Sequence, residues 1–182
     1  VVIFGSTWVN YKGNTPETKQ GEAYIVSITP GEGDDNQGGG NGGGGDVVSG
    51  NTITMDFTAQ GFDNAQDIST ITLSDGTTLT FDAGTNRNGP KYYNAGTAIR
   101  MYPSNFFTVA SAAKKSASIV LNCSENNAEG NVTANPGTVA VDGMKITISG
   151  IDAGSTQITN AHTGTGATSQ LRLSSIAITY AE

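Results

Sequence analysis

The chain has 182 residues, which is enough for one full domain and leaves a remainder too short for a second. Sixteen acidic and nine basic residues give a net charge of −7, so the chain lacks the basic surface that binding to nucleic acid or anionic membranes requires. No apolar run reaches the roughly 18 residues of a membrane-spanning helix. The chain begins with Val1 rather than methionine, and we expect it to be an internal or processed piece of a longer protein.

Residues 1–29 predict a short β segment. VVIFGSTWV (1–9) and EAYIVSIT (22–29) are rich in strand-forming residues, and a polar, turn-rich stretch joins them at 10–21. Two strands alone are marginally stable in water, so we expect this segment to pair with another surface, in the same chain or in a neighbour.

Residues 30–46, PGEGDDNQGGGNGGGGD, predict a flexible linker. The stretch contains nine glycines and no large apolar side chain, so nothing in it can offset the entropy lost on ordering. A phosphate-binding glycine loop is the alternative, but the Lys-Ser/Thr pair that such a loop needs does not follow.

Residues 47–182 predict an all-β domain. In ITMDFTA (53–59), alternation places Ile53, Met55, Phe57 and Ala59 on one face of a strand. Further strands are predicted at 68–74, 77–83, 97–102, 106–111, 116–122, 131–135, 137–141, 144–150 and 171–181. About ten short antiparallel strands at this spacing favour a two-sheet jelly-roll β-sandwich.

Local signals fix parts of the strand register. Asp75-Gly76 and Asp142-Gly143 predict two tight hairpins. In the second hairpin, Val139 and Val141 should face the apolar set Met144, Ile146 and Ile148. In the last strand, the apolar positions before and after Ser174-Ser175 are out of phase, so a bulge there is needed to keep both sets inward.

The stretch TITMDFTAQGFDNAQDISTITLSDGTTLTFDAGTNRNGPKYYNAGTAIRMYPSN (52–105) and the closing LRLSSIAITY (171–180) resemble a β-sandwich module that recurs near the C-termini of surface and secreted proteins of gut bacteria. That module is similar to the galactose-binding-like jelly rolls, a fold shared with many carbohydrate-binding modules. The resemblance implies an extracellular or cell-surface location, with no established activity of the family's own. Relatives often carry a basic pair in the last strand, where this chain has Leu171-Arg172. Residues 1–28 resemble the closing strands of an OB-like barrel.

The inventory of catalytic groups is small, and we do not expect an enzyme. His162 is the only histidine and lies in a Gly- and Thr-rich stretch that predicts a loop, which is a poor support for a catalytic triad. Cys123 is the only cysteine, falls on the apolar side of its strand and is expected to be buried. A pair of glycosidase carboxylates stays open as an alternative among the aspartates.

One loop could hold a metal ion. Asp63, Asn64 and Asp67 in GFDNAQD supply oxygen ligands of the kind that calcium prefers, which suggests a structural calcium site and no other cofactor. The alternative is a turn in which these side chains hydrogen-bond to the local backbone.

The stretch NRNGPKYYNAGTAIRMY (86–102) carries the strongest binding signal. Candidate ligand-binding residues are Tyr92, Tyr93, Arg100 and Tyr102, joined by Arg172 from the last strand. Tyrosine rings stack on the C–H faces of sugars, and the guanidinium donates hydrogen bonds to hydroxyls. Both arginines should project from an outer sheet face, and the tyrosine pair is expected in a loop after Pro90. The alternative is a structural sheet corner in which one tyrosine caps the core.

These observations predict a non-catalytic binding module of an exported bacterial surface protein. Its partner would be a glycan or another surface protein. The alternative is a structural or adhesive module that makes protein–protein contacts or spaces domains, without a small ligand.

Overall fold

A computed structural model describes residues 10–11, 16–17, 45–124 and 131–182. The chain divides into two compact units, Val1–Gly40 and Asn41–Glu182, and each is considered by itself. In the first unit, β1 (Asn10–Tyr11) pairs antiparallel with β2 (Pro16–Glu17). This short ladder falls in the stretch that the sequence predicts as a connecting turn.

Several predictions for the first part of the chain lie outside the described residues. They are the two strands predicted at 1–9 and 22–29 and the linker up to residue 44.

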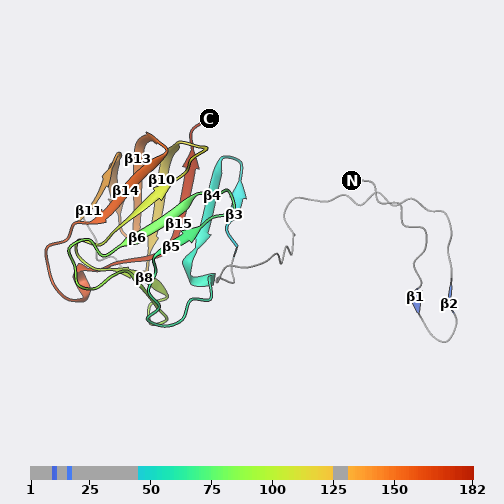
Figure 1. Cartoon of the computed structure of the whole chain (residues 1–182), viewed down its shortest axis with the longest axis horizontal. Coiled ribbons are helices and arrows are strands. Elements are labelled where there is room, and N and C mark those ends of the chain that lie inside the picture. The colour runs from blue at the N-terminus through green and yellow to red at the C-terminus, as the bar shows by residue number, and fades with distance from the viewer. Residues whose placement is uncertain (1–9, 12–15, 18–44, 125–130) are drawn as a thin grey trace. The chain divides into compact units, whose positions relative to one another are not determined.

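The second unit is an all-β sandwich of two antiparallel sheets (Figure 1). The strands are β3 (Val47–Ser49), β4 (Thr52–Asp56), β5 (Thr70–Thr72), β6 (Thr78–Asp82), β7 (Lys91–Tyr93), β8 (Ala98–Met101), β9 (Phe106–Ala110), β10 (Ser116–Cys123), β11 (Val132–Asn135), β12 (Thr138–Asp142), β13 (Lys145–Ala153), β14 (Ser155–Asn160) and β15 (Leu171–Tyr180). Two 3-10 turns, η1 (Phe57–Ala59) and η2 (Ala167–Ser169), complete the described elements.

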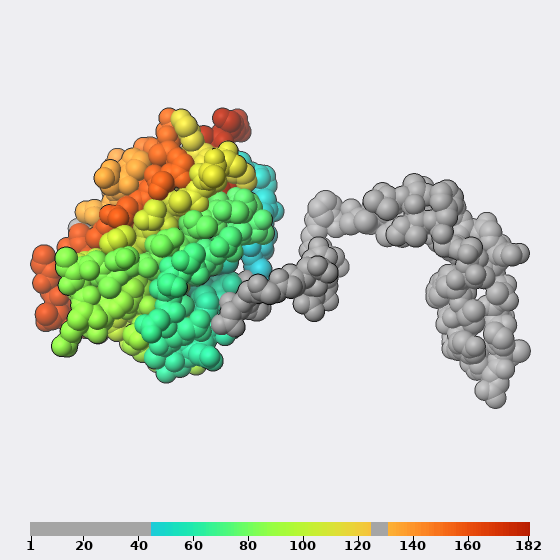
Figure 2. Space-filling model, in the orientation of Figure 1, coloured from blue at the N-terminus to red at the C-terminus, as the bar shows by residue number. Residues whose placement is uncertain are grey.

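The sheet topology confirms the predicted fold class. The eight-stranded sheet has the order β12-β13-β10-β15-β4-β3, with β8 also paired to β15 and β7 paired to β8. The five-stranded sheet has the order β11-β14-β9-β6-β5. The chain passes repeatedly from one sheet to the other between β4 and β15, as in a jelly roll. In the space-filling view, the described residues of the second unit form a compact body (Figure 2).

The core lies between the sheets. The largest fully buried side chains are Ile53, Phe57, Leu79, Ile99, Met101, Phe107, Ile119, Leu121, Ile146, Ile148, Ile158 and Leu171. Apart from Phe57, which lies in η1, they come from both sheets at alternate strand positions. Cys123 belongs to the same core, and burial raises the pKa of its thiol to about 12.

The predicted bulge in β15 is confirmed. Asn122 of β10 lies opposite Ser175, whereas the next residue, Cys123, lies opposite Leu173, so Ser174 is the extra residue. The Ser174 hydroxyl donates to the carbonyl of Asn122 at 2.9 Å. Because of this bulge, the apolar positions on both sides of it are buried, including Leu173 and Ile176 at 0% exposure.

Both Asp-Gly hairpins are confirmed. Gly76 has φ +84° between β5 and β6, and Gly143 has φ +56° between β12 and β13. Both values lie in the left-handed region, which glycine reaches without steric cost. The prediction for Met144 was wrong: this side chain is 52% exposed, because it lies in the turn before β13 begins.

The face predicted for residues 53–59 needs one correction. Ile53, Met55 and Phe57 are buried, but Ala59 is exposed and Gln60 is buried in its place. The strand ends at Asp56, whose carboxylate accepts a hydrogen bond from the Thr58 amide at 2.8 Å and caps η1. The helical turn replaces the two-residue period, which is why alternation fails there.

In the second unit, three strands were not predicted from the sequence: β3, β7 and β14. The segment that forms β7 was predicted as a loop, yet it pairs antiparallel with β8. In β14, the inward positions include Thr156 and Asn160, so polar residues interrupt the apolar alternation. No helix in the described part of the chain is long and apolar enough to cross a membrane.

Candidate ligand-binding site

Basic and aromatic side chains share the outer face of β7, β8 and β15. Arg100 of β8 lies directly between Lys91 of β7 and Arg172 of β15 in the strand register. Facing residues on neighbouring antiparallel strands share one side of the sheet, so all three side chains point away from the core. Like charges in this position repel each other, and each arginine is therefore held by other contacts.

Arg100 rests on an aromatic ring. Its guanidinium carbon lies 4.2 Å from the centre of the Tyr93 ring, and one of its amino groups donates to the Ala95 carbonyl at 2.8 Å. The Tyr93 hydroxyl lies 3.4 Å from the Tyr102 hydroxyl. Burial, together with the hydrogen bond to Tyr93, raises the pKa of Tyr102 to about 12, so Tyr102 stays protonated at neutral pH.

Arg172 is covered. It is 8% exposed, and its Nε donates to Oε1 of Gln170 at 3.1 Å. Its backbone carbonyl accepts a hydrogen bond from Ser124. Arg172 can therefore orient Gln170, whereas its own side chain presents little surface to a ligand.

Tyr92 does not join this group. It points to the opposite side of β7 from Tyr93, is 4% exposed, and packs against Phe62 with ring centres 5.4 Å apart. The structure thus brings Tyr93, Arg100 and Tyr102 together with Arg172, and places Tyr92 in the core.

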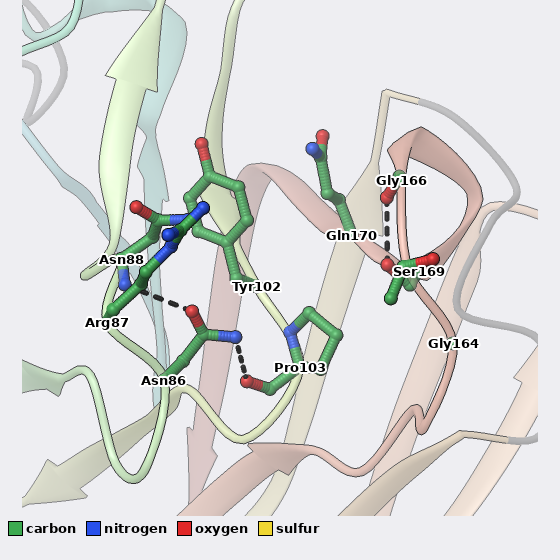
Figure 3. Close-up of a pocket in the computed structure, with 10 residues that line it drawn as sticks. Asn86, Arg87, Asn88, Tyr102, Pro103, Gly164, Gly166, Ser169 and Gln170 are labelled. Carbon is green, nitrogen blue, oxygen red and sulfur yellow. Dashed lines mark hydrogen bonds between the residues drawn. The ribbon is translucent and has the colours of Figure 1, made fainter.

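A cleft begins where this outer face ends (Figure 3). It has a volume of about 320 Å³, within the roughly 300–1,000 Å³ typical of small-molecule sites. We call it the first cleft; it is lined by Asn86, Arg87, Asn88, Tyr102, Pro103, Gly164, Thr165, Gly166, Ser169 and Gln170. The side chains of Tyr102 and Gln170 project in the same direction (Figure 3). Tyr102 therefore connects the outer-face cluster with the cleft.

The loop between β6 and β7 forms one wall of the first cleft. The Asn86 side chain donates to the Pro103 carbonyl at 2.8 Å and accepts a hydrogen bond from the Asn88 amide at 3.0 Å (Figure 3). Arg87 lies between these two residues, is exposed, and has no hydrogen bond or ion pair with another described residue. Its donors therefore have no acceptor in the part of the chain that the structure describes, and they can serve a ligand.

Two buried asparagines hold the cleft loops in place. Asn105 is 0% exposed, and its side-chain oxygen accepts a hydrogen bond from the Tyr102 amide at 2.8 Å. Its amide nitrogen donates to the carbonyls of Ala83 and Asn88, both at 2.9 Å. One side chain thus joins the β6–β7 loop to the residue that presents the tyrosine ring.

Asn160 has the same role for the loop between β14 and β15. It is 0% exposed, and its amide donates to the carbonyls of Met101 at 2.9 Å and Ser169 at 2.8 Å. Its oxygen accepts a hydrogen bond from the His162 amide at 3.2 Å. The backbone amide of Asn160 donates to the Asn105 carbonyl at 2.9 Å, so the two residues form one linked unit, the asparagine pair.

Most residues that line the first cleft were not predicted from the sequence. Asn86, Arg87 and Asn88 open the stretch that drew attention to the tyrosines, but they were not singled out. The sequence gives one indication of the asparagine pair. Asn160 is the last residue of β14 and Asn105 directly precedes β9, at strand ends where an apolar or solvated residue is the usual choice. Gln170 gave no signal, because only the fold places it beside Tyr102.

The residues predicted to bind calcium make other contacts in the structure. Asp67 forms an ion pair with Lys91 at 2.8 Å, and Oδ1 of Asn64 accepts a hydrogen bond from the Asn94 amide at 3.1 Å. The Asp63 amide donates to the Gln66 side chain, as in a turn. Within the described ranges, no group of three histidine, cysteine or acidic side chains could hold a metal ion. These contacts do not fit a preformed calcium site, which stays a prediction.

His162 is part of the same loop region as the first cleft. Its Nδ1 accepts a hydrogen bond from the Gly164 amide at 2.7 Å, which fixes the imidazole ring on its own loop. No carboxylate contacts this ring among the described residues. The expectation that the chain is not an enzyme stays a prediction.

In comparisons with known proteins, the chain matches no family model and no curated protein sequence.

Proposed function

We propose that the sandwich is a non-catalytic binding module of an exported bacterial surface protein, and that its ligand is a glycan. The observation that carries this proposal is the first cleft, in which one tyrosine ring lies among amide, hydroxyl and guanidinium groups. A sugar offers a C–H face for stacking and hydroxyls that accept and donate hydrogen bonds, and this lining complements both.

Preorganisation supports the same function. The asparagine pair fixes the cleft loops through hydrogen bonds from two fully buried side chains, so little loop entropy is lost when a ligand binds. Tyr102 stays neutral, and its hydroxyl lies beside the hydroxyl of Tyr93. The guanidinium of Arg100 lies over the Tyr93 ring. In this account, Arg100 and Arg172 act as supports for Tyr102 and Gln170 rather than as direct ligand contacts.

A glycan array with the full chain tests the proposal. We expect retention of at least one glycan, loss of that signal in Tyr102→Leu, and a clear reduction in Arg87→Ala. Lys145→Ala is the matched control, because it removes an exposed positive charge on β13 and this residue does not line the cleft. No signal on the array, or equal signals for Tyr102→Leu and the unchanged chain, would contradict a glycan site in the first cleft.

The second candidate function is structural or adhesive, and one surface favours it. A row of hydroxyl side chains crosses the outer face of the eight-stranded sheet at facing positions: Ser49, Thr52, Thr179, Ser118, Ser149 and Thr138. Such a surface suits contact with another protein, because it has many hydrogen-bonding groups and few charges. A chain that binds no glycan, but that self-associates and loses this association in Ser118→Lys, would favour this candidate.

A further inference from the structure

A second cleft lies beside the first and shares Pro103 with it as a common wall. Its volume is about 600 Å³, and it is lined by Gly84, Thr85, Pro103, Ser104, Phe106, Gln157, Thr159, Asn160, Ala161, His162 and Thr163. Both clefts use the β6–β7 loop and the β14–β15 loop. The first cleft takes the later residues of each loop, and the second cleft takes the earlier ones.

The floor of the second cleft includes an outward-facing aromatic ring. Phe106 opens β9 and is half-buried, whereas its neighbour Phe107 is fully buried and stacks on Phe81 with ring centres 5.1 Å apart. Core packing is thus supplied by Phe107, and Phe106 points to the other side of the sheet. Thr159 faces Phe106 across the strands, so a hydroxyl lies beside the ring.

The walls of the second cleft have a defined conformation. Gly84 has φ +57°, and a Cβ atom there would collide with the Ser104 carbonyl oxygen, so only glycine allows this close approach. On the other side, the Gly164 amide donates to Nδ1 of His162. Because Nδ1 accepts this hydrogen bond, the ring proton lies on Nε2, which has no hydrogen bond with a described residue and can donate to a ligand.

We propose that the two clefts are adjacent subsites for consecutive units of one glycan chain that passes over Pro103. The ligand class is therefore an oligosaccharide rather than a single terminal sugar. Each cleft pairs one aromatic ring, Tyr102 or Phe106, with amide and hydroxyl groups. This inference rests on the proposed function, because it extends the same site.

The test is a glycan array printed with length series, from monosaccharides to hexasaccharides, and probed with the full chain. We expect the signal to rise with chain length within the retained series. Phe106→Leu should weaken the longer members by about tenfold, the loss expected for one stacking contact, and leave the shortest retained member unchanged. Phe106→Tyr keeps the ring and should restore the length dependence. Thr108→Ala is the control on the same face of β9, outside both clefts.

The outcomes separate the two proposals. Equal retention of short and long members, or unchanged binding of long members by Phe106→Leu, would overturn the second subsite and leave the glycan site in the first cleft standing. No retention of any member would overturn both. Thermal melts of each variant show whether the fold is intact, and Phe106→Tyr supplies the comparison if Phe106→Leu loses stability.

Discussion

The two ends of the sandwich are built from different interactions. At the end formed by residues 73–77, 111–115 and 150–154, short turns are joined by charged side chains: Lys114 pairs with Asp75 at 3.1 Å, and Lys115 pairs with Asp152 at 3.3 Å. At the opposite end, the loops that form the clefts are joined by the asparagine pair.

This difference shows how a fold keeps surface groups available for binding. At the turn end, the charges are used by their partners, and Lys114 also lies 4.5 Å from the centre of the Tyr180 ring. At the cleft end, buried neutral amides satisfy the loop backbone, so polar side chains such as Arg87 are left for a ligand. We therefore expect mutations at the turn end to change stability alone, and mutations of the cleft lining to change binding.

The largest effect is expected at the asparagine pair. Asn160→Ala removes three hydrogen bonds of a fully buried side chain and leaves two carbonyls and one amide without that partner. We predict a loss of about 3 kcal/mol in the free energy of unfolding, measured by urea denaturation. Asn86→Ala, whose side chain is only half-buried, should cost less than half as much. Equal losses in the two variants would show that the asparagine pair is not the support we describe.

Two glycines, one from each end of the sandwich, form a matched pair for which we expect stability losses of intermediate size. Gly84→Ala combines a left-handed backbone with a collision against Ser104, and we expect it to cost about 2–3 kcal/mol. Gly76→Ala has a left-handed backbone but nothing within 4 Å of the new Cβ, so only about 1 kcal/mol is expected. Thermal denaturation of both variants checks the order. A larger loss for Gly76→Ala would mean that the β6–β7 loop can relax away from Ser104.

The stability effect expected at Asp75 depends on pH. Burial alone would raise the pKa of this carboxyl, but hydrogen bonds from Tyr180, Thr77 and Lys114 lower it from 3.8 to about 2. A lowered pKa in the folded state means that the ionised carboxylate stabilises the fold above about pH 4 and that this contribution is lost between about pH 4 and pH 2.

Asp75→Asn should therefore cost about 1–2 kcal/mol at pH 7, and its difference from the unchanged chain should disappear as the pH falls to about 2. Urea denaturation at a series of pH values measures the difference. A difference in the free energy of unfolding that stays constant from pH 7 to pH 2 would mean that the charge of Asp75 does not stabilise the turn end.

Much of the fold could be predicted because its signals are local. The alternation in Ile53 and Met55, the two Asp-Gly turns and the phase change at Ser174 each depend on a few neighbouring residues. The alternation also required Tyr92 and Tyr93 to point to opposite sides. Which of them is buried was decided by the pairing of Tyr92 with the fully buried Ile99 of β8, a contact that the sequence does not specify.

The site was harder to predict because it is assembled from distant segments. The first cleft combines residues 86–88, 102–103, 164–166 and 169–170, and no local pattern links them. Its main support, Asn160, points into the interior at the end of β14. Because this inward residue is polar, β14 lacks the apolar alternation by which a strand is predicted. Buried polar groups at loop ends are visible only once their partners are known.

An NMR titration of the full chain with the glycan most strongly retained on the array tests the central claim most directly. We predict that amide shift changes concentrate in residues 83–89, 102–106 and 157–170, with no change in the turns at 73–77 and 111–115. Shift changes confined to those turns or to the hydroxyl row on the eight-stranded sheet would contradict a binding site at the cleft end.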